Sequence, residues 1–367
     1  MKLMNIRDGD KLGIKEYTAV LIICIGIKAT DSTPTLLYKQ GANAGWMIPI
    51  ISSVIVFLSL SCLLAVLERY KNMNLIEIIY HLTGKYIGAV LGTLFFISVT
   101  LILATNIRNY VDVLSSIYFR RTPIFVLAAV MIISCYIIAR LGIRAIGRTA
   151  WMALPWIIVI TIAFVILVYN LIKVDYLYPI GGAGVKQILK GGVLYSGIFS
   201  EVIVFSVIFP QVKNYKSFKN SSYIALLYAV ISISLMSAIY IMVMDYPPVV
   251  INSSPFHTVA RLIYGGRFVS NLEAFFLLFW IIASIIRFGM YVYTDAALIS
   301  YTLKLSDKKQ MLSAISAIIL MLSMIPENYI ENINIGRRTL INVDWILMYI
   351  VPCALLFLSQ RKGDYKL

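Results

Sequence analysis

Residues 17–41 read YTAVLIICIGIKATDSTPTLLYKQG, a membrane-type apolar run that is interrupted in its middle. The run breaks at Gly26, the residues from Lys28 to Thr33 are polar, and a new apolar turn follows Pro34. A hydroxyl residue followed by proline is a typical start of a helix. The sequence therefore predicts two half-helices, the second of which begins inside the membrane.

A second segment has the same interruption. Residues 190–212 read KGGVLYSGIFSEVIVFSVIFPQV, with a break at Tyr195-Ser196-Gly197 and Glu201 one turn later. Each break exposes carbonyl groups on one side and N–H groups on the other, and the N–H end attracts anions. Interrupted helices at corresponding places in two halves of a chain indicate a transporter-type site at the bilayer midplane. The alternative is two kinked helices with a buried Lys–Glu pair that serves packing.

The composition supports a membrane protein. Of 367 residues, 60% are hydrophobic and 13% charged, against about 45–50% and ~25% in soluble domains. This excludes a soluble globular enzyme and a disordered chain. Runs of about 20 apolar residues predict ten membrane spans: 15–38, 45–67, 86–107, 122–140, 149–172, 188–211, 220–244, 272–300, 310–326 and 340–359. We expect one transmembrane domain over residues 1–367, with repeats at 15–172 and 186–326 and a tenth helix.

The basic residues predict the orientation. The formal charge is +15, from 32 Lys and Arg against 17 Asp and Glu. With ten spans, nineteen basic residues lie on the side of the termini and eleven, from Lys39 to Arg338, on the other. Cytoplasmic loops carry the excess of basic residues, so both termini are predicted to be cytoplasmic. No basic patch interleaved with aromatics is present, which argues against nucleic acid.

No enzyme, metal or cofactor motif is found. The four cysteines (Cys24, Cys62, Cys135 and Cys353) are expected to be small buried hydrophobic residues, without disulfide or zinc spacing. The two histidines, His81 and His257, are expected in solvated or interfacial loops. Residues 74–83 and 246–268 are predicted to be amphipathic interfacial segments. Gly84, Gly88 and Gly92 form a small-residue series that predicts close helix packing.

Charged residues within the predicted spans mark candidate sites. Arg287, Tyr291 and Asp295 are spaced to share one helix face. Arg287 could take the place of a coupling cation, or pair with Glu201 or Asp295, or form a structural salt bridge to the first span. An amino-acid ligand would suit the two breaks: its carboxylate would meet N–H groups near residues 29–32 and its ammonium the carbonyls near Gly26 and Tyr195.

The chain resembles the B subunits of spore germinant receptors, the spore germination permeases of the amino acid–polyamine–organocation superfamily. The resemblance covers nearly the whole chain and rests on the order and spacing of elements across the ten spans. These elements are Gly26-Ile27 with the proline restart, Gly84-Lys85-Tyr86-Ile87-Gly88, Gly142-Ile143 leading to Arg148, Ser196-Gly197 through Glu201, Phe209-Pro210, Asn271-Leu272-Glu273, Trp280, Arg287 and Tyr291.

The resemblance implies an all-α fold of ten transmembrane helices, in two inverted five-helix repeats with broken helices 1 and 6 (LeuT-like). It also implies a multi-pass protein of the spore inner membrane that binds a small-molecule germinant, typically an amino acid. A larger membrane subunit and a lipoprotein subunit would complete the receptor. The expected ligand-binding residues are Gly26, Ile27, Lys28, Ala29, Thr30, Asp31, Ser32, Thr100, Tyr195, Ser196, Gly197, Ile198, Phe199, Glu201, Arg287 and Tyr291.

Two departures from the family pattern bear on the ligand. Many members have a smaller, apolar sequence where this chain has Lys28-Ala29-Thr30-Asp31, and many have lysine in place of Arg287. These departures argue for a ligand other than a simple neutral amino acid, and Lys28 could replace a sodium ion or a proton in the site. A proton-coupled amino-acid permease and a scaffold with a vestigial pocket remain as alternatives, because fold alone does not separate them.

Overall fold

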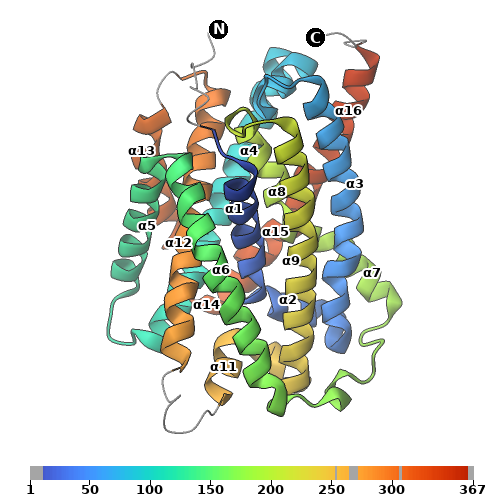
Figure 1. The fold of residues 1–367 in the computed structure, drawn as a ribbon, viewed down its shortest axis with the longest axis vertical. Helices are drawn as coiled ribbons and strands as arrows, with labels where there is room; N and C mark the ends of the chain where they lie inside the picture. The colour runs from blue at the N-terminus through green and yellow to red at the C-terminus, as the bar shows by residue number, and fades with distance from the viewer. Residues whose placement is uncertain (1–10, 253, 264–271, 306–307, 363–367) are drawn as a thin grey trace.

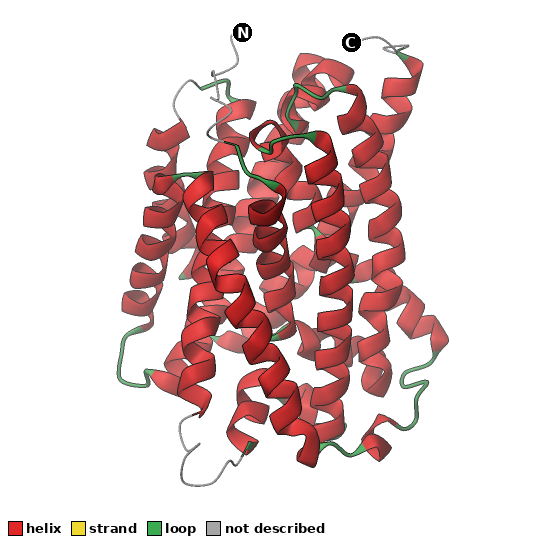
Figure 2. Ribbon diagram, viewed as in Figure 1, coloured by secondary structure: helices red, strands yellow, loops and turns green. Residues whose placement is uncertain are grey.

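The structure is a computed structural model that describes residues 11–252, 254–263, 272–305 and 308–362. Figure 2 shows an all-helical bundle over these ranges. The described part contains no strand beyond a single bridge between Leu12 and Val212. The start of α1 and the end of α16 lie at the same end of the bundle (Figure 1), as an even number of spans requires.

The first half of the chain forms the helices up to α6. They are α1 Ile14–Gly26, α2 Thr33–Gly41, α3 Ile48–Arg69, α4 Leu75–Val113, α5 Ile124–Leu141 and α6 Ile143–Val168. The second half forms α7 Val185–Leu194, α8 Glu201–Val204, α9 Tyr215–Met244, α10 Pro248–Ile251, α11 Pro255–Leu262, α12 Leu272–Thr302, α13 Lys308–Ser323, α14 Tyr329–Glu331, α15 Arg338–Trp345 and α16 Val351–Arg361.

The predicted membrane fold is confirmed. Seven helical segments in the described residues are long and apolar enough to cross a bilayer. The first, sixth and ninth predicted spans are not among them, because α1 has 13 residues, α7 has 10 and α13 has 16. Two of these three are the spans predicted to be broken, so their short pieces are the expected result.

The tenth span begins earlier than predicted. Helical structure starts at Tyr329 and runs to Arg361 through α14, α15, α16 and two π-helical segments, Asn332–Arg337 and Ile346–Ile350. The residues just before position 340 are polar, so a hydropathy argument does not predict a helix there.

Two basic residues that the span count placed in outer loops, Arg108 and Arg337, are buried. They therefore do not contribute to the loop charge that predicts orientation.

Residues 75–83 form the predicted amphipathic helix, and Asn74 and Glu77 close its start with a reciprocal capping box. The expected packing role of Gly84 is wrong: its φ is +83° and a Cβ there would touch nothing, so it is a bend between two helices. Gly88 does pack against Tyr80, and Gly92 packs against Thr302.

The second predicted amphipathic segment, residues 246–268, contains the short helices α10 and α11. Its residues 264–268 lie outside the described residues.

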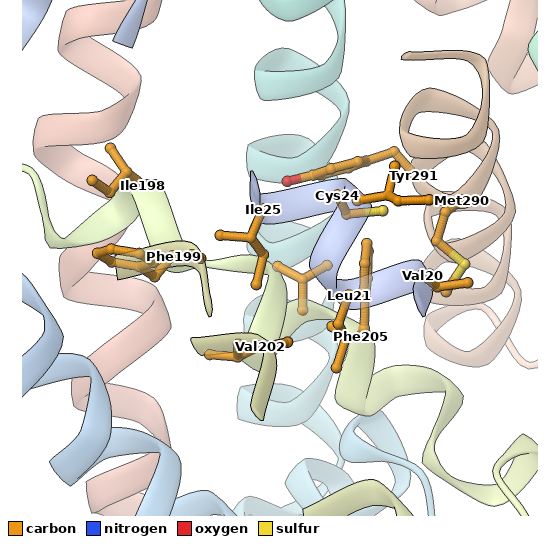
Figure 3. Packing of buried hydrophobic residues seen from close by; sticks show 14 of the residues in the cluster. Val20, Leu21, Cys24, Ile25, Ile198, Phe199, Val202, Phe205, Met290 and Tyr291 are labelled. Carbon is orange, nitrogen blue, oxygen red and sulfur yellow. The ribbon is translucent and has the colours of Figure 1, made fainter. Parts of the chain in front are cut away.

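The core of the bundle surrounds α1. This helix contacts α6, α9 and α12, and its residues from Ala19 to Ile25 are buried, as expected for a helix that is apolar on all sides. Figure 3 shows its side chains between those of the sixth span and those of α12.

The cysteines follow the prediction in part. Cys24 and Cys135 are buried as predicted, whereas Cys353 is exposed. The sulfur of Cys353 lies 3.7 Å from the sulfur of Cys62, and the two form no disulfide.

Candidate functional site

The first break has the predicted form but a different cap. α1 ends at Gly26, a single 3₁₀ turn covers Ile27–Ala29, and α2 begins at Thr33 with Pro34 in its first turn. No hydroxyl caps α2. Instead, the Thr33 N–H donates to Asp31 Oδ1 at 2.7 Å. This N–H group of the restart is therefore already paired with a carboxylate of the chain itself.

At the second break, carbonyl groups freed from the helix accept hydrogen bonds from side chains of other spans. α7 ends at Leu194 and a 3₁₀ segment covers Ser196–Phe199. The Tyr349 hydroxyl donates to the Ser196 carbonyl at 2.5 Å, and the Lys28 ammonium donates to the Ile198 carbonyl. Lys28 thus connects the two breaks directly.

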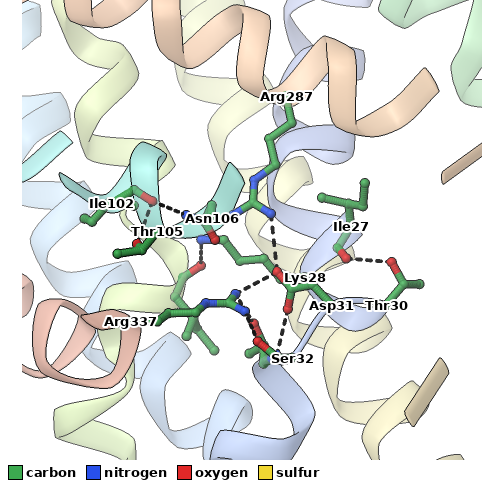
Figure 4. A network of polar contacts seen from close by, with 12 residues as sticks. Ile27, Lys28, Thr30, Asp31, Ser32, Ile102, Thr105, Asn106, Arg287 and Arg337 are labelled. Atoms are coloured by element: carbon green, nitrogen blue, oxygen red, sulfur yellow. Dashed lines mark hydrogen bonds and ion pairs between the residues drawn. The ribbon is translucent and has the colours of Figure 1, made fainter. Parts of the chain in front are cut away.

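Five buried charged side chains, of Lys28, Asp31, Glu201, Arg287 and Arg337, form one network between the breaks. Figure 4 shows Lys28, Asp31, Arg287 and Arg337 of this network. Lys28 Nζ lies 2.6 Å from Glu201 Oε2. Arg287 lies 3.4 Å from Asp31 Oδ2 through Nη1, and 3.6 Å from Glu201 Oε1 through Nη2. Arg337 Nη2 lies 2.6 Å from Asp31 Oδ2. Buried charges in a membrane are costly unless paired, so this network joins the first, sixth, eighth and tenth spans.

Arg337 is the residue that the sequence argument missed. It also donates to the Ser32 hydroxyl and, at 2.8 Å, to Thr33 Oγ1. Arg337, Ile341 and Asp344 are all buried, at the spacing of one helix face. That spacing is the signal that could have placed Arg337 inside the bundle, although the polar stretch NINIGRR around it resembles a loop.

Two small cavities adjoin the network. One has about 340 Å³, including space that opens to solvent, and is lined by Lys28, Ile102, Thr105, Asn106, Gly197, Ile198, Ser200, Arg287, Arg337, Leu340 and Ile341. The other has about 220 Å³ and is lined by Ile27, Asp31, Asn106, Asn109, Tyr110, Trp280, Ser284, Arg287 and Phe288. Asn106 and Arg287 belong to both linings, so the cavities are neighbours.

A larger cavity of about 670 Å³ lies on the other side of the first break, between α1, α6, α9 and α12. Its lining includes the predicted residues Gly26, Ile27, Ala29 and Thr30, but it has no charged residue. A charged or zwitterionic ligand would find no ionic partner there. The smaller charged cavities therefore fit the predicted ligand better.

The structure brings most of the predicted site residues together. Lys28, Gly197, Ile198 and Arg287 line the 340 Å³ cavity, and Ile27 and Asp31 line its neighbour. Ser32 and Glu201 belong to the network, and Ser196 bonds Tyr349. Tyr195, Phe199, Thr100 and Tyr291 are buried but line none of these three cavities.

Asp295 does not pair with Arg287, which was one of the alternatives. Its Oδ2 accepts a hydrogen bond from Thr100 Oγ1 at 2.7 Å, and its Oδ1 has no partner. Asp344 is similar, because Ser98 Oγ donates to its Oδ1 at 2.5 Å and its Oδ2 is unpaired. Neither carboxyl forms a salt bridge within the described residues.

The expected place of His257 is wrong, whereas His81 lies in the predicted interfacial segment 74–83. His81 lies within α4 and is partly buried. His257 lies in α11 and is buried, and its Nδ1 is 2.9 Å from the Tyr118 hydroxyl. Burial, together with the nearby Arg261 charge, lowers the pKa of His257 to about 3, so the ring is neutral.

Comparison with known proteins identifies the family. The family model described as "Spore germination protein" matches residues 15–331. Spore germination protein KB of Bacillus subtilis is 26% identical over 333 residues, which cover 88% of this chain and 87% of that protein. Spore germination protein YndE of the same species is 22% identical, over 96% of this chain and 98% of that protein.

Solved structures agree on the fold. Mhp1, a nucleobase-cation-symport-1 family transporter with bromovinylhydantoin bound, superposes with a TM-score of 0.67 at 12% identity, over 97% of this chain and 80% of Mhp1. A mutant of the Eremococcus coleocola manganese transporter superposes with a TM-score of 0.56 at 14% identity, over 92% of this chain and 78% of the transporter. These likenesses confirm the LeuT-like fold. With the family match over most of its length, the chain belongs to the spore germination protein family, the spore germination permeases.

Proposed function

We propose that this chain is the germinant-sensing subunit of a spore germination receptor, and that it binds a small molecule, an amino acid, between broken helices 1 and 6. One observation carries the proposal: five buried charged side chains form a network between the two breaks, and two cavities adjoin this network. A network that served packing alone would need no adjoining polar space. The membership of the spore germination family supports a sensing role for such a site.

The proposal includes the membrane in which the protein lies, its orientation there and its partner subunits. It is a multi-pass protein of the spore inner membrane with cytoplasmic termini, and a larger membrane subunit and a lipoprotein complete the receptor. Adjacent genes for these two subunits, and their co-purification with this chain from spore membranes, would support the assembly. Purification of this chain alone from such membranes would contradict it.

A second candidate is a proton-coupled amino-acid permease. The observation that favours it is Asp295, a fully buried carboxyl that accepts a hydrogen bond from the Thr100 hydroxyl and forms no salt bridge within the described residues. A charged carboxylate in such a place is costly, so Asp295 fits a group that takes up and releases a proton during transport.

One experiment separates these functions. The purified protein is reconstituted in liposomes, and binding and uptake of labelled amino acids are measured with and without a pH gradient. Glu201→Gln is compared with Asp112→Asn. Asp112 is also a buried carboxylate in an ion pair, 2.9 Å from Arg108. Its partner Arg108 lines none of the three cavities, whereas the partners of Glu201, Lys28 and Arg287, line the 340 Å³ cavity.

A sensor predicts saturable binding without uptake, and binding is lost in Glu201→Gln but kept in Asp112→Asn. Uptake that needs the pH gradient, and that Asp295→Asn abolishes, would make the protein a permease instead. The absence of binding to every amino acid of the panel would contradict both functions and favour a scaffold.

A further inference from the structure

The network leaves more donors than acceptors for a ligand. Three of the four carboxylate oxygens of Asp31 and Glu201 are engaged: Asp31 Oδ1 with the Thr33 N–H, Asp31 Oδ2 with two guanidinium groups, and Glu201 Oε2 with Lys28. Glu201 Oε1 has no hydrogen-bond partner within the described residues, but Glu201 does not line the 340 Å³ cavity. On the cationic side, Arg287 Nε and Nη2 have no hydrogen-bond partner in the part of the chain that the structure describes. The Nη2 contact with Glu201 is 3.6 Å, too long for a hydrogen bond.

The charges in the network do not balance. Lys28, Arg287 and Arg337 carry three positive charges, whereas Asp31 and Glu201 carry two negative charges. The 340 Å³ cavity is lined by all three cations and by no carboxylate. The buried carboxyls nearby, Asp295 and Asp344, are bonded to hydroxyls and not to these cations.

We infer that the ligand of this cavity carries a net negative charge, as an acidic amino acid or a dicarboxylate does. This inference rests on the proposed function and names the ligand class of the same site. A carboxylate beside Arg287 accepts charge-assisted hydrogen bonds from Nε and Nη2 in the bidentate geometry that guanidinium groups favour. The bound anion thereby balances the third positive charge, which is costly to leave uncompensated inside a membrane.

The lining of the neighbouring cavity indicates what the rest of the ligand would contact. It is lined by Trp280, Tyr110 and Phe288 together with Asn109. The ring centroids of Tyr110 and Trp280 are 4.0 Å apart, which provides an apolar wall. The unpaired acceptors there, within the described residues, are the neutral Asn109 Oδ1 and the Tyr110 hydroxyl. Asp31 also lines this cavity, but both of its oxygens are engaged, so an ammonium group would find no free carboxylate. A simple zwitterion is therefore matched at its carboxylate only.

The test compares ligands that differ only in charge. Binding of L-glutamate and L-glutamine, L-aspartate and L-asparagine, and succinate and succinamide is measured on the full-length protein in liposomes. We expect the acid of at least one pair to bind about tenfold or more tightly than its amide, since hydrogen bonds between a guanidinium group and a charged carboxylate are stronger than those to a neutral amide. The succinate pair shows whether an ammonium group is needed.

Variants then assign the preference to a residue. Arg287→Gln is expected to abolish the preference for the acid, and Arg287→Lys to keep part of it. Arg108→Gln serves as the control, because Arg108 is also buried in a salt bridge, at 2.9 Å from Asp112, but lines none of the three cavities; it should leave the preference unchanged.

The outcomes are distinct. If the neutral amides bind as tightly as the acids, the inference on ligand charge is overturned, whereas the proposed sensing function stands. If neither member of any pair binds, the proposed function is contradicted, and the inference fails with it. The wild-type comparison decides the question even if Arg287→Gln does not fold.

Discussion

The two breaks look alike in the sequence but are stabilised differently. At the first break, the chain supplies its own anion, because Asp31 accepts the Thr33 N–H at the start of α2. At the second break, the freed carbonyls of Ser196 and Ile198 accept hydrogen bonds from Tyr349 and Lys28, which come from the tenth and first spans. The N–H end at the first break is capped by a neighbouring residue, whereas these carbonyls of the second break are bonded to residues of other spans.

The difference changes the origin of anion affinity. A helix start inside the membrane attracts anions, and the sequence alone predicted a ligand carboxylate there. The structure fills that position with Asp31 and presents the positive charge through Arg287, Lys28 and Arg337 instead. The selectivity of the site is therefore a property of side chains, which substitution can change one at a time.

The largest predicted effect concerns the two carboxylates. Asp31→Asn and Glu201→Gln should each lower the free energy of unfolding by about 3–5 kcal/mol, because each leaves a buried cation without its partner. Asp31→Asn should cost more, since two guanidinium groups contact Asp31. Thermal and denaturant unfolding in detergent measures both.

A double variant tests the cause. Lys28→Met combined with Glu201→Gln should regain part of the stability lost in Glu201→Gln alone, since removing both partners leaves no unpaired charge. Losses that simply add would show that the 2.6 Å pair does not stabilise the connection between the breaks.

A smaller effect is expected at the glycines of the breaks. A Cβ at Gly197 would lie 2.9 Å from the backbone oxygen of Ile341, whereas a Cβ at Gly26 would lie 3.0 Å from the side chain of Tyr228. Gly197→Ala should cost about 1–3 kcal/mol, the usual range for overpacking. Gly26→Ala should cost less, because a half-buried side chain yields more readily than backbone. Unfolding midpoints in the opposite order would reverse this comparison.

The smallest effect concerns two tyrosines that hold the breaks. Tyr349 donates to Ser196 O at 2.5 Å, and Tyr240 donates to Ala29 O at 2.8 Å. Tyr349→Phe and Tyr240→Phe should each cost about 0.5–1.5 kcal/mol. Hydrogen exchange measured by mass spectrometry should rise locally, at residues 195–200 in the first variant and at residues 27–31 in the second. Exchange that rises equally at both breaks would show that they open as one unit.

Most of the fold could be predicted because it follows from local signals. Apolar runs of span length, Pro34 after a hydroxyl residue, and the glycines at the two breaks each act through nearby backbone. The charges inside spans also predicted the first, sixth and eighth spans as the walls of the site. The resemblance to the family added the inverted relation of the two five-helix repeats, which no local signal contains.

The errors of the sequence argument come from tertiary contacts. Arg337 looks like a loop residue, because only packing against Asp31 and Ser32 makes its polar helix part of the bundle. The cap on α2 was assigned to a hydroxyl, because the orientation of Asp31 depends on the same arginines. His257 was expected at the interface, but α11 buries it beside Tyr118.

The central claim is that the two breaks enclose a water-accessible, electropositive cavity. Thr105 lines this cavity and is partly buried, so Thr105→Cys can report on it. In a chain without its native cysteines, the reaction rates of anionic and cationic methanethiosulfonate reagents of similar size are measured at Thr105→Cys and at Asn72→Cys, which lies in the exposed turn between α3 and α4. We predict that the preference for the anionic reagent is about tenfold larger at position 105 than at position 72, since positive potential concentrates anions. Equal rates, faster reaction of the cationic reagent, or no reaction at position 105 would contradict the account.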